Sequence, residues 1–208
     1  MSRRVSKFFK VLAVALLLIW PAVSKADTIN ENFNELPTSL NATNLGAFTV
    51  TSGTVDVVGG ALFGFLCVAP ESGNCVDLDG SNGQAGQISS ANLTLTPGTY
   101  ILSFDLIGSQ RAVDTSTTVT LGTLYDQTFL LSSGDITSGI VDATINVGTT
   151  TVAPLIFTSN TPGNVGAVLD NVSLVSSVPE PATLSFLGIG LAALMFRRRA
   201  AKSLPTSQ

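Results

Sequence analysis

The sequence has no histidine among its 208 residues, and basic residues are almost missing from its middle. Of ten lysines and arginines, five lie in the first 25 residues and four lie from Arg197 onward, so only Arg111 falls between them. The lack of histidine excludes histidine-dependent catalytic triads and the usual zinc sites. Thirteen carboxylates from Asp27 to Asp170 stand against that one arginine, which gives this segment a net charge near −12. Nucleic acid and anionic lipid headgroups are therefore excluded as partners.

The first 26 residues have the three parts of a secretory signal peptide. Four basic residues come first, an apolar run follows over 11–20, and Ser24 and Ala26 supply the small side chains that a signal peptidase reads. We expect cleavage before Asp27. The alternative is an uncleaved anchor, for which the run is short. The sequence thus predicts export of residues 27–177, a length that suits one domain.

A second apolar segment lies near the C-terminus, over 182–196. The residues that flank it are Pro179, Glu180, Pro181, Arg197, Arg198 and Arg199. As a helix this run would be roughly 22 Å long at about 1.5 Å per residue, shorter than the ~30 Å core of a bilayer. The arginines would snorkel on the cytoplasmic side, and the prolines would keep the triplet extended on the other side. On these properties alone, a plain tail anchor and a processing signal are equally good interpretations.

The segment from Val178 to Arg199 resembles the PEP-CTERM sorting signal of Gram-negative bacteria, in which a Pro-Glu-Pro triplet precedes a short spanning segment and an arginine cluster. The resemblance implies recognition by an exosortase, a membrane cysteine transpeptidase that processes its substrates near the triplet. It also implies a transient stay in the inner membrane and association with exopolysaccharide. One departure is the cytoplasmic tail 200–208, which continues where many such signals end.

Two cysteines, Cys67 and Cys75, lie close together in the predicted exported domain. In an oxidising compartment we expect them to form a disulfide. The alternative is metal binding, for which no histidine is available. A bonded pair would leave no thiolate for nucleophilic catalysis.

The exported domain is rich in Thr, Ser, Val and Gly, with turn signals every eight to twelve residues and no periodicity of helical length. The predicted strands cover residues 47–52, 54–58, 62–68, 75–79, 86–95, 99–107, 117–124, 127–131, 140–147, 152–158 and 167–175. Between 99 and 107, Tyr100, Leu102, Phe104 and Leu106 alternate with more polar residues and give the strand one apolar face. The sequence predicts an all-β fold, an antiparallel β-sandwich of jelly-roll type, between the signal peptide and a single transmembrane helix.

The order of four blocks in this domain resembles galactose-binding-like jelly rolls, in particular the domain of unknown function 642. The blocks are FTVTSGTVDVV at 48–58, CVDLDGSNGQAGQIS at 75–89, PGTYILSFDL at 97–106 and VLDNVSL at 168–174. The family usually has a tryptophan where Phe48 stands here.

Carboxylates are the remaining candidates for chemistry. Asp77 and Asp79 share one face of a predicted strand and could form a glycosidase pair, but they also border a Gly-Ser-Asn-Gly loop and could simply accept turn hydrogen bonds. We favour the turn. Asp170 shares parity with Val172 on the predicted strand and would face inward unless the strand bulges. An inward-facing carboxylate requires a partner. The family resemblance brings Glu31 beside this strand, so the two carboxylates could share a structural Ca²⁺, with solvation or backbone capping as the alternative.

Exposed aromatic rings would serve a sugar-binding surface. The candidates are Phe63, Phe65 and Tyr125, with Phe129 beside them, and core packing is the alternative for each. We therefore expect a non-enzymatic β-sandwich without a cofactor, apart from possible calcium. It would act at the cell surface or in the extracellular matrix, associated with exopolysaccharide. The alternatives are a carbohydrate-binding module and, less favoured, a glycoside hydrolase.

Overall fold

The computed structural model describes residues 28–59, 67, 73–135 and 140–177. The predicted signal peptide, the segment from Val178 onward and the predicted strand 62–68, except Cys67, lie outside these residues. Within the described ranges, no helix is long and apolar enough to cross a membrane.

The described chain is built from antiparallel strands, as predicted. They are β1 (Ile29–Glu31), β2 (Ser39–Ala42), β3 (Asn44–Leu45), β4 (Phe48–Ser52), β5 (Val55–Gly59), β6 (Asn74–Asp77), β7 (Gln87–Ser90), β8 (Leu93–Leu95), β9 (Gly98–Ile107), β10 (Thr115–Leu121), β11 (Tyr125–Leu131), β12 (Ile140–Val147), β13 (Thr151–Ala153), β14 (Leu155–Ser159) and β15 (Val168–Ser176). Two predicted strands are each divided in two, 86–95 into β7 and β8 and 152–158 into β13 and β14.

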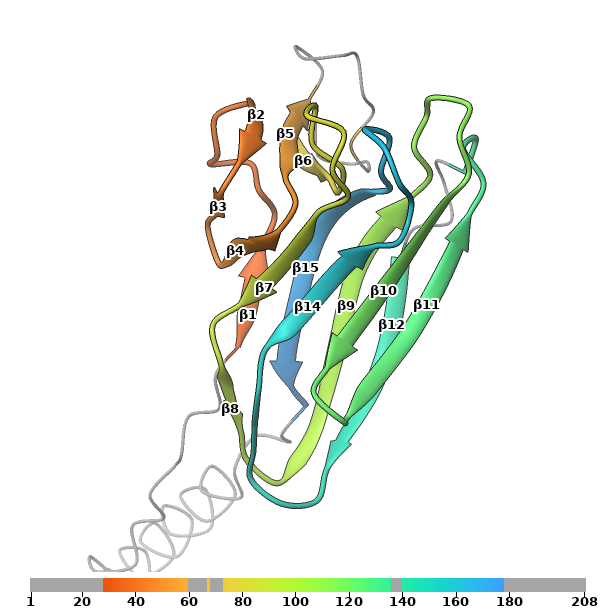
Figure 1. The fold of residues 1–208 in the computed structure, drawn as a ribbon. Helices are drawn as coiled ribbons and strands as arrows, with labels where there is room; N and C mark the ends of the chain where they lie inside the picture. Colours follow the sequence, from red (N-terminus) through yellow and green to blue (C-terminus); the bar gives the residue numbers. More distant parts are fainter. Residues whose placement is uncertain (1–27, 60–66, 68–72, 136–139, 178–208) are drawn as a thin grey trace, which may run out of the picture.

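Two sheets pack face to face (Figure 1). The seven-stranded sheet has the order β12-β9-β15-β6-β5-β2, and β1 pairs with β15 beside it. The six-stranded sheet has the order β11-β10-β14-β7-β4-β3, and β8 pairs with β13 in a small separate sheet. The prediction of an all-β antiparallel sandwich is confirmed.

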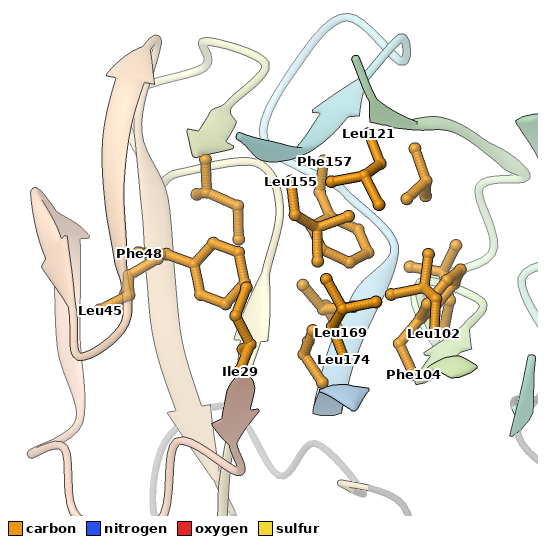
Figure 2. Packing of buried hydrophobic residues seen from close by; sticks show 14 of the residues in the cluster. Ile29, Leu45, Phe48, Leu102, Phe104, Leu121, Leu155, Phe157, Leu169 and Leu174 are labelled. Atoms are coloured by element: carbon orange, nitrogen blue, oxygen red, sulfur yellow. The ribbon is translucent and has the colours of Figure 1, made fainter. Parts of the chain in front are cut away.

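The core between the sheets is built on the alternation predicted for β9. Tyr100, Leu102, Phe104 and Leu106 are each at most 1% exposed. The Phe157 ring from the facing sheet packs edge-on against Phe104 at 5.2 Å and against Phe48 at 5.9 Å, measured between ring centroids. Figure 2 shows these rings among leucines of both sheets. Phe157 therefore joins the two layers near the middle of the core.

The predicted disulfide is confirmed. Cys67 and Cys75 are joined by an S–S bond of 2.02 Å, with their Cα atoms 5.6 Å apart. Both cysteines pack with Val58, Ile107 and Val168 in a small second cluster, separate from the main core.

Strand β15 bulges, which changes the direction of one predicted site residue. Its pairing with β9 shifts register between Asp170 and Ser173, and Asn171 in the shift has a φ of 49°. Asp170 pairs with Asp105, whose neighbours Phe104 and Leu106 face the core. The strand thus bulges, which was the stated exception to an inward-facing Asp170, and the bulge reverses parity between Asp170 and Val172. Asp170 lies on the opposite face of the sheet from Phe104 and Leu106, but it is still buried, at 1% exposure.

Replacing Phe157 with alanine should remove the contact between the sheets and leave a cavity. We expect Phe157→Ala to lower the free energy of unfolding by about 3–5 kcal/mol in denaturant titration. Val152→Ala is the control, since Val152 is 60% exposed, and it should change stability by less than about 0.5 kcal/mol. Equal losses for the two variants would contradict the assignment of this core.

Candidate functional site

Asp77 and Asp79 lie at the end of β6, and both are almost fully buried, at 1% and 0% exposure. One Asp77 oxygen, Oδ1, accepts hydrogen bonds from the backbone N–H groups of Asp79 and Gly166, both at 3.0 Å. Its other oxygen, Oδ2, pairs with the Arg111 guanidinium. Asp79 Oδ1 accepts from the Gly86 N–H at 3.4 Å. The two carboxylates thus bind backbone amides, as the turn interpretation required, but they lie much deeper than a surface turn.

Arg111 reaches Asp77 from the loop between β9 and β10. The two residues that flank it, Gln110 and Ala112, have φ of 57° and 58°, a left-handed conformation that costs roughly 1–2 kcal/mol for each non-glycine residue. Ser109 stabilises the loop, because its Oγ donates to the Val113 carbonyl at 2.6 Å and accepts the Arg111 N–H at 3.2 Å. The ion pair with Asp77 therefore secures a strained loop.

Burial governs the protonation of both carboxylates. Loss of solvent raises the pKa of Asp77 to about 7, against the opposing effect of Arg111 and the two backbone amides. Burial also raises the pKa of Asp79, which its hydrogen bonds with Ser159 and Gly86 only partly offset. The carboxyl groups of Asp77 and Asp79 therefore stay protonated to a higher pH than those of exposed aspartates.

Buried hydroxyl groups extend this polar cluster between the sheets. Thr115 and Thr117 on β10 are 3% and 0% exposed, and Thr117 pairs with Ser159 on β14. Thr115 Oγ1, Thr117 Oγ1 and Asp79 Oδ2 are buried without a hydrogen-bond partner among the described groups. Unpaired buried polar atoms are costly, so these three atoms lower the stability of this end of the sandwich.

A surface pocket of about 470 Å³ opens beside the cluster. Its lining is Asp114, Thr115, Ser116, Leu130, Leu131, Ser132, Asn160, Thr161 and Pro162. Its volume lies in the range of small-ligand sites, roughly 300–1,000 Å³. Hydroxyl and amide groups alternate with apolar carbon around it, and Leu130 is 82% exposed at the rim.

Hydrogen bonds between three loops hold this pocket. Asp114 accepts the Ser133 N–H at 2.9 Å, and the Thr161 hydroxyl accepts the Ser116 N–H at 2.9 Å. The Asn160 amide donates to Thr118 Oγ1 at 2.8 Å and to Ser116 Oγ at 3.3 Å. The lining is therefore pre-organised, and it can both donate and accept hydrogen bonds to a hydroxylated ligand.

The segments that line the pocket, at the start of β10 and at the ends of β11 and β14, lie at the opposite end of the sandwich from the end of β15 (Figure 1). Ser176 pairs with Tyr100 near the start of β9, and the Ser177 N–H donates to the Thr99 carbonyl at 2.8 Å. The Arg111 loop follows the other end of β9. Nine steps of about 3.3 Å along that strand separate the two ends by roughly 30 Å.

Comparison with protein families identifies the segment that follows β15. Residues 177–199 match the PEP-CTERM protein-sorting motif. The resemblance seen in the sequence is thereby confirmed, and the motif indicates an exported protein that an exosortase processes. The PEP-CTERM motif begins directly after Ser176, the last residue of β15.

No curated protein matches the chain significantly. Similar solved structures include the C-terminal CBM6 module of a marine laminarinase from Zobellia galactanivorans, with 12% identity, 72% coverage of this chain, 100% of that chain and a TM-score of 0.39. A family 35 carbohydrate binding module from Clostridium thermocellum has 12% identity, coverages of 73% and 100%, and a TM-score of 0.40. A cleaved adhesin domain of Lys-gingipain from Porphyromonas gingivalis has 12% identity, coverages of 73% and 99%, and a TM-score of 0.45. These values carry no inference about ligand or activity.

The predicted sugar-binding aromatics do not line the pocket in the described part of the chain. Tyr125 lies at the start of β11, at the other end of that strand from the pocket, and packs half-buried against the core. Phe129 packs edge-on against Phe104 at 5.7 Å between ring centroids. Phe63 and Phe65 lie outside the described residues, as do the Pro-Glu-Pro triplet and the three arginines of the PEP-CTERM motif.

The two predicted calcium ligands lie on neighbouring strands. Glu31 on β1 pairs with Val172 on β15, so the expected proximity of these segments is confirmed. Both Glu31 oxygens, however, accept backbone N–H groups, from Phe33 at 3.0 Å and from Ala47 at 2.8 Å. Asp170 Oδ1 accepts the Asn171 N–H at 2.8 Å. No three acidic or cysteine side chains converge in the described ranges, and calcium bound by Glu31, Asp170 and carbonyl oxygens stays a prediction from the sequence.

The raised pKa of Asp77 gives the fold an unusual pH dependence. Between the usual value of 3.8 and about 7, the folded protein holds a proton that the unfolded chain has lost. Stability should therefore fall as pH rises through this window, by up to about 1.4 kcal/mol per pH unit, and level off above it. Denaturant titrations across the window measure this slope.

Asp77→Asn cannot titrate, so its stability should depend much less on pH over the same range. Asp142→Asn is the matched control, because Asp142 is exposed on β12 and should leave the slope as in the wild type. Because the pKa of Asp79 is raised as well, a shallower slope should remain in Asp77→Asn, and a slope as steep as in the wild type would show that Asp77 is not responsible.

Proposed function

We propose that this chain is exported, held briefly in the inner membrane and processed by an exosortase, and that its β-sandwich then acts at the cell surface or in the matrix among exopolysaccharide. The PEP-CTERM match at 177–199 carries this proposal. The signal-peptide pattern of the first 26 residues and the arginines at the end of the motif support it, because together they leave the sandwich on the outer side of the membrane.

The position of the motif also orients the sandwich relative to the membrane. The chain leaves β15 at the end of the domain that is remote from the pocket (Figure 1). Before processing, the membrane would therefore lie near the start of β9, and the pocket would face away from it. Such an arrangement suits a domain that contacts polymers outside the cell.

Replacing Pro179, Glu180 and Pro181 with alanine should retain the protein in the inner membrane, because the exosortase loses its recognition element while the apolar run remains. Membrane fractionation and immunoblotting measure the distribution. Alanine at Ser203, Leu204 and Pro205 is the control, since these residues, which include a proline, lie beyond the motif. Release of the triplet variant at the wild-type level would leave a plain tail anchor as the better interpretation.

A second function, binding of a neutral glycan in the pocket, is favoured by the chemistry of its lining. Ser116, Ser132 and Thr161 offer hydroxyl groups, and Leu130 and Pro162 offer apolar surface for the C–H face of a sugar ring. Asp114 can accept hydrogen bonds from sugar hydroxyls and, with the net negative charge of the domain, repels anionic polymers.

The same geometry argues against a glycoside hydrolase. Such an enzyme needs two carboxylates that flank the substrate. Asp77 and Asp79 are buried and bind backbone amides, and neither lines the pocket. We therefore propose a binding role without catalysis.

Affinity electrophoresis in gels that contain a neutral β-glucan, a neutral galactomannan or polygalacturonate tests the pocket. We expect retardation by at least one neutral polymer and none by polygalacturonate. Asn160→Ala should weaken the neutral binding on the order of tenfold, because it removes the side-chain bonds that hold the loop after β14 against β10 in the pocket. Asn146→Ala, exposed on β12, is the control. Absence of retardation by both neutral polymers, or equal effects of the two variants, would contradict this function.

A further inference from the structure

The two sheets end on one side of the sandwich in long, regular strands. Strand β11 is the last strand of the six-stranded sheet and pairs with β10 through seven consecutive residue pairs, from Thr115–Leu131 to Leu121–Tyr125. Strand β12 is the last strand of the other sheet and pairs with β9 through eight consecutive residue pairs. Neither ladder contains a register shift, and neither outer edge pairs with another described strand.

The opposite side of the sandwich is different. There the sheets end in β2, of four residues, and β3, of two. The pairing of β2 with β5 shifts register between Ser39 and Ala42, and Asn41 in that shift has a φ of 54°. Short, irregular edges are a common way to prevent pairing with another chain. Among the described strands, one side of the sandwich is therefore protected against edge pairing and the other side is not.

Composition does not protect the regular edges either. Lysine, which commonly prevents an edge strand from pairing with another chain, does not occur between residues 26 and 201. Strands β11 and β12 also contain no proline, and each carries a single charge, Asp126 and Asp142 respectively. On β11 the exposed side chains include Thr128 and Leu130, and Leu130 at 82% has the highest exposure of the large hydrophobic residues described.

From these observations we propose that two copies of this chain associate through β11, antiparallel and about a two-fold axis at Thr128, so that the six-stranded sheet continues from one copy into the other. An antiparallel edge is complementary to itself, which makes a second copy the simplest partner. The short edges at β2 and β3 do not match β11 in length, so they do not compete with a second β11 as its partner.

Register and charge select the axis at Thr128. This register pairs all seven residues of β11, Tyr125 with Leu131 and Asp126 with Leu130. Each Asp126 carboxylate then faces an apolar side chain, whereas an axis at Asp126 would oppose the two carboxylates directly. The Thr128 hydroxyl already bonds to Thr118 on the next strand, 2.8 Å away, so the dimer would continue a row of threonines across its axis.

The net negative charge of the domain opposes this association. Salt screens repulsion between exposed charges, so the dimer should be favoured as the ionic strength rises. A binding mode that depended on opposite charges would respond in the other direction.

Sedimentation velocity of the full chain, purified in mild detergent from expressing cells, tests the proposal. We expect a monomer–dimer equilibrium that shifts toward dimer in salt. Thr128→Lys places two lysines face to face and should raise the dimer dissociation constant on the order of tenfold or more. Thr49→Lys is the matched control, because Thr49 is an exposed threonine of the same sheet whose strand β4 is paired on both sides. It should leave the equilibrium as in the wild type.

Cross-linking tests the register. With Cys67 and Cys75 bonded to each other, Thr128→Cys introduces a single free thiol, which copper phenanthroline should oxidise to a disulfide-linked dimer, whereas Thr49→Cys should stay monomeric. Thermal melts of all variants check that the fold is intact. A monomeric wild type in high salt, equal effects of the two lysine variants, or equal cross-linking of the two cysteine variants would each overturn the proposal. Association through the C-terminal segment would leave Thr128→Lys dimeric and would overturn it equally.

Discussion

The antiparallel ladder between β9 and β15 is the interaction on which the rest of the structure depends. Strand β15 is paired with β9, β6 and β1, so it joins the first and last segments of the domain to the centre of one sheet. It ends at Ser176 beside the start of β9, and the PEP-CTERM motif follows at once. The other end of β9 leads into the Arg111 loop. One ladder thus separates the sorting segment from the loops that shape the pocket.

The single arginine of the exported domain explains why those loops are ordered as they are. Its pairing with Asp77 joins the strained loop after β9 to the end of β6. Asp77 also accepts the Gly166 N–H from the loop before β15. A side chain at Gly166 would place its Cβ 2.6 Å from the Asp77 carboxylate, so glycine is required there. A buried acid with a raised pKa and two buried hydroxyl groups without a hydrogen-bond partner among the described groups make this end less stable.

Local patterns predicted much of this fold, and tertiary contacts decided the rest. The alternation of β9, the disulfide and the sorting motif were all visible in the sequence. The split between β13 and β14 occurs at Pro154, which cannot donate to a ladder and was a usable signal. The sequence did not show the position of the bulge at Asn171. It also did not show the burial of Asp77, because the partner of Asp77, Arg111, lies 34 residues away. The pocket could not be predicted from the sequence, because its lining comes from three separate segments. The serine, threonine and asparagine residues in these segments are common throughout the domain.

We propose that an exosortase processes this chain at its PEP-CTERM motif and that the sandwich then stays outside the membrane without its C-terminal segment. Mass spectrometry of the C-terminal peptide of the exported protein tests this most directly. The account predicts a terminus near Pro179, Glu180 and Pro181, with residues 182–208 absent. An exported protein that still ends at Gln208 would contradict it.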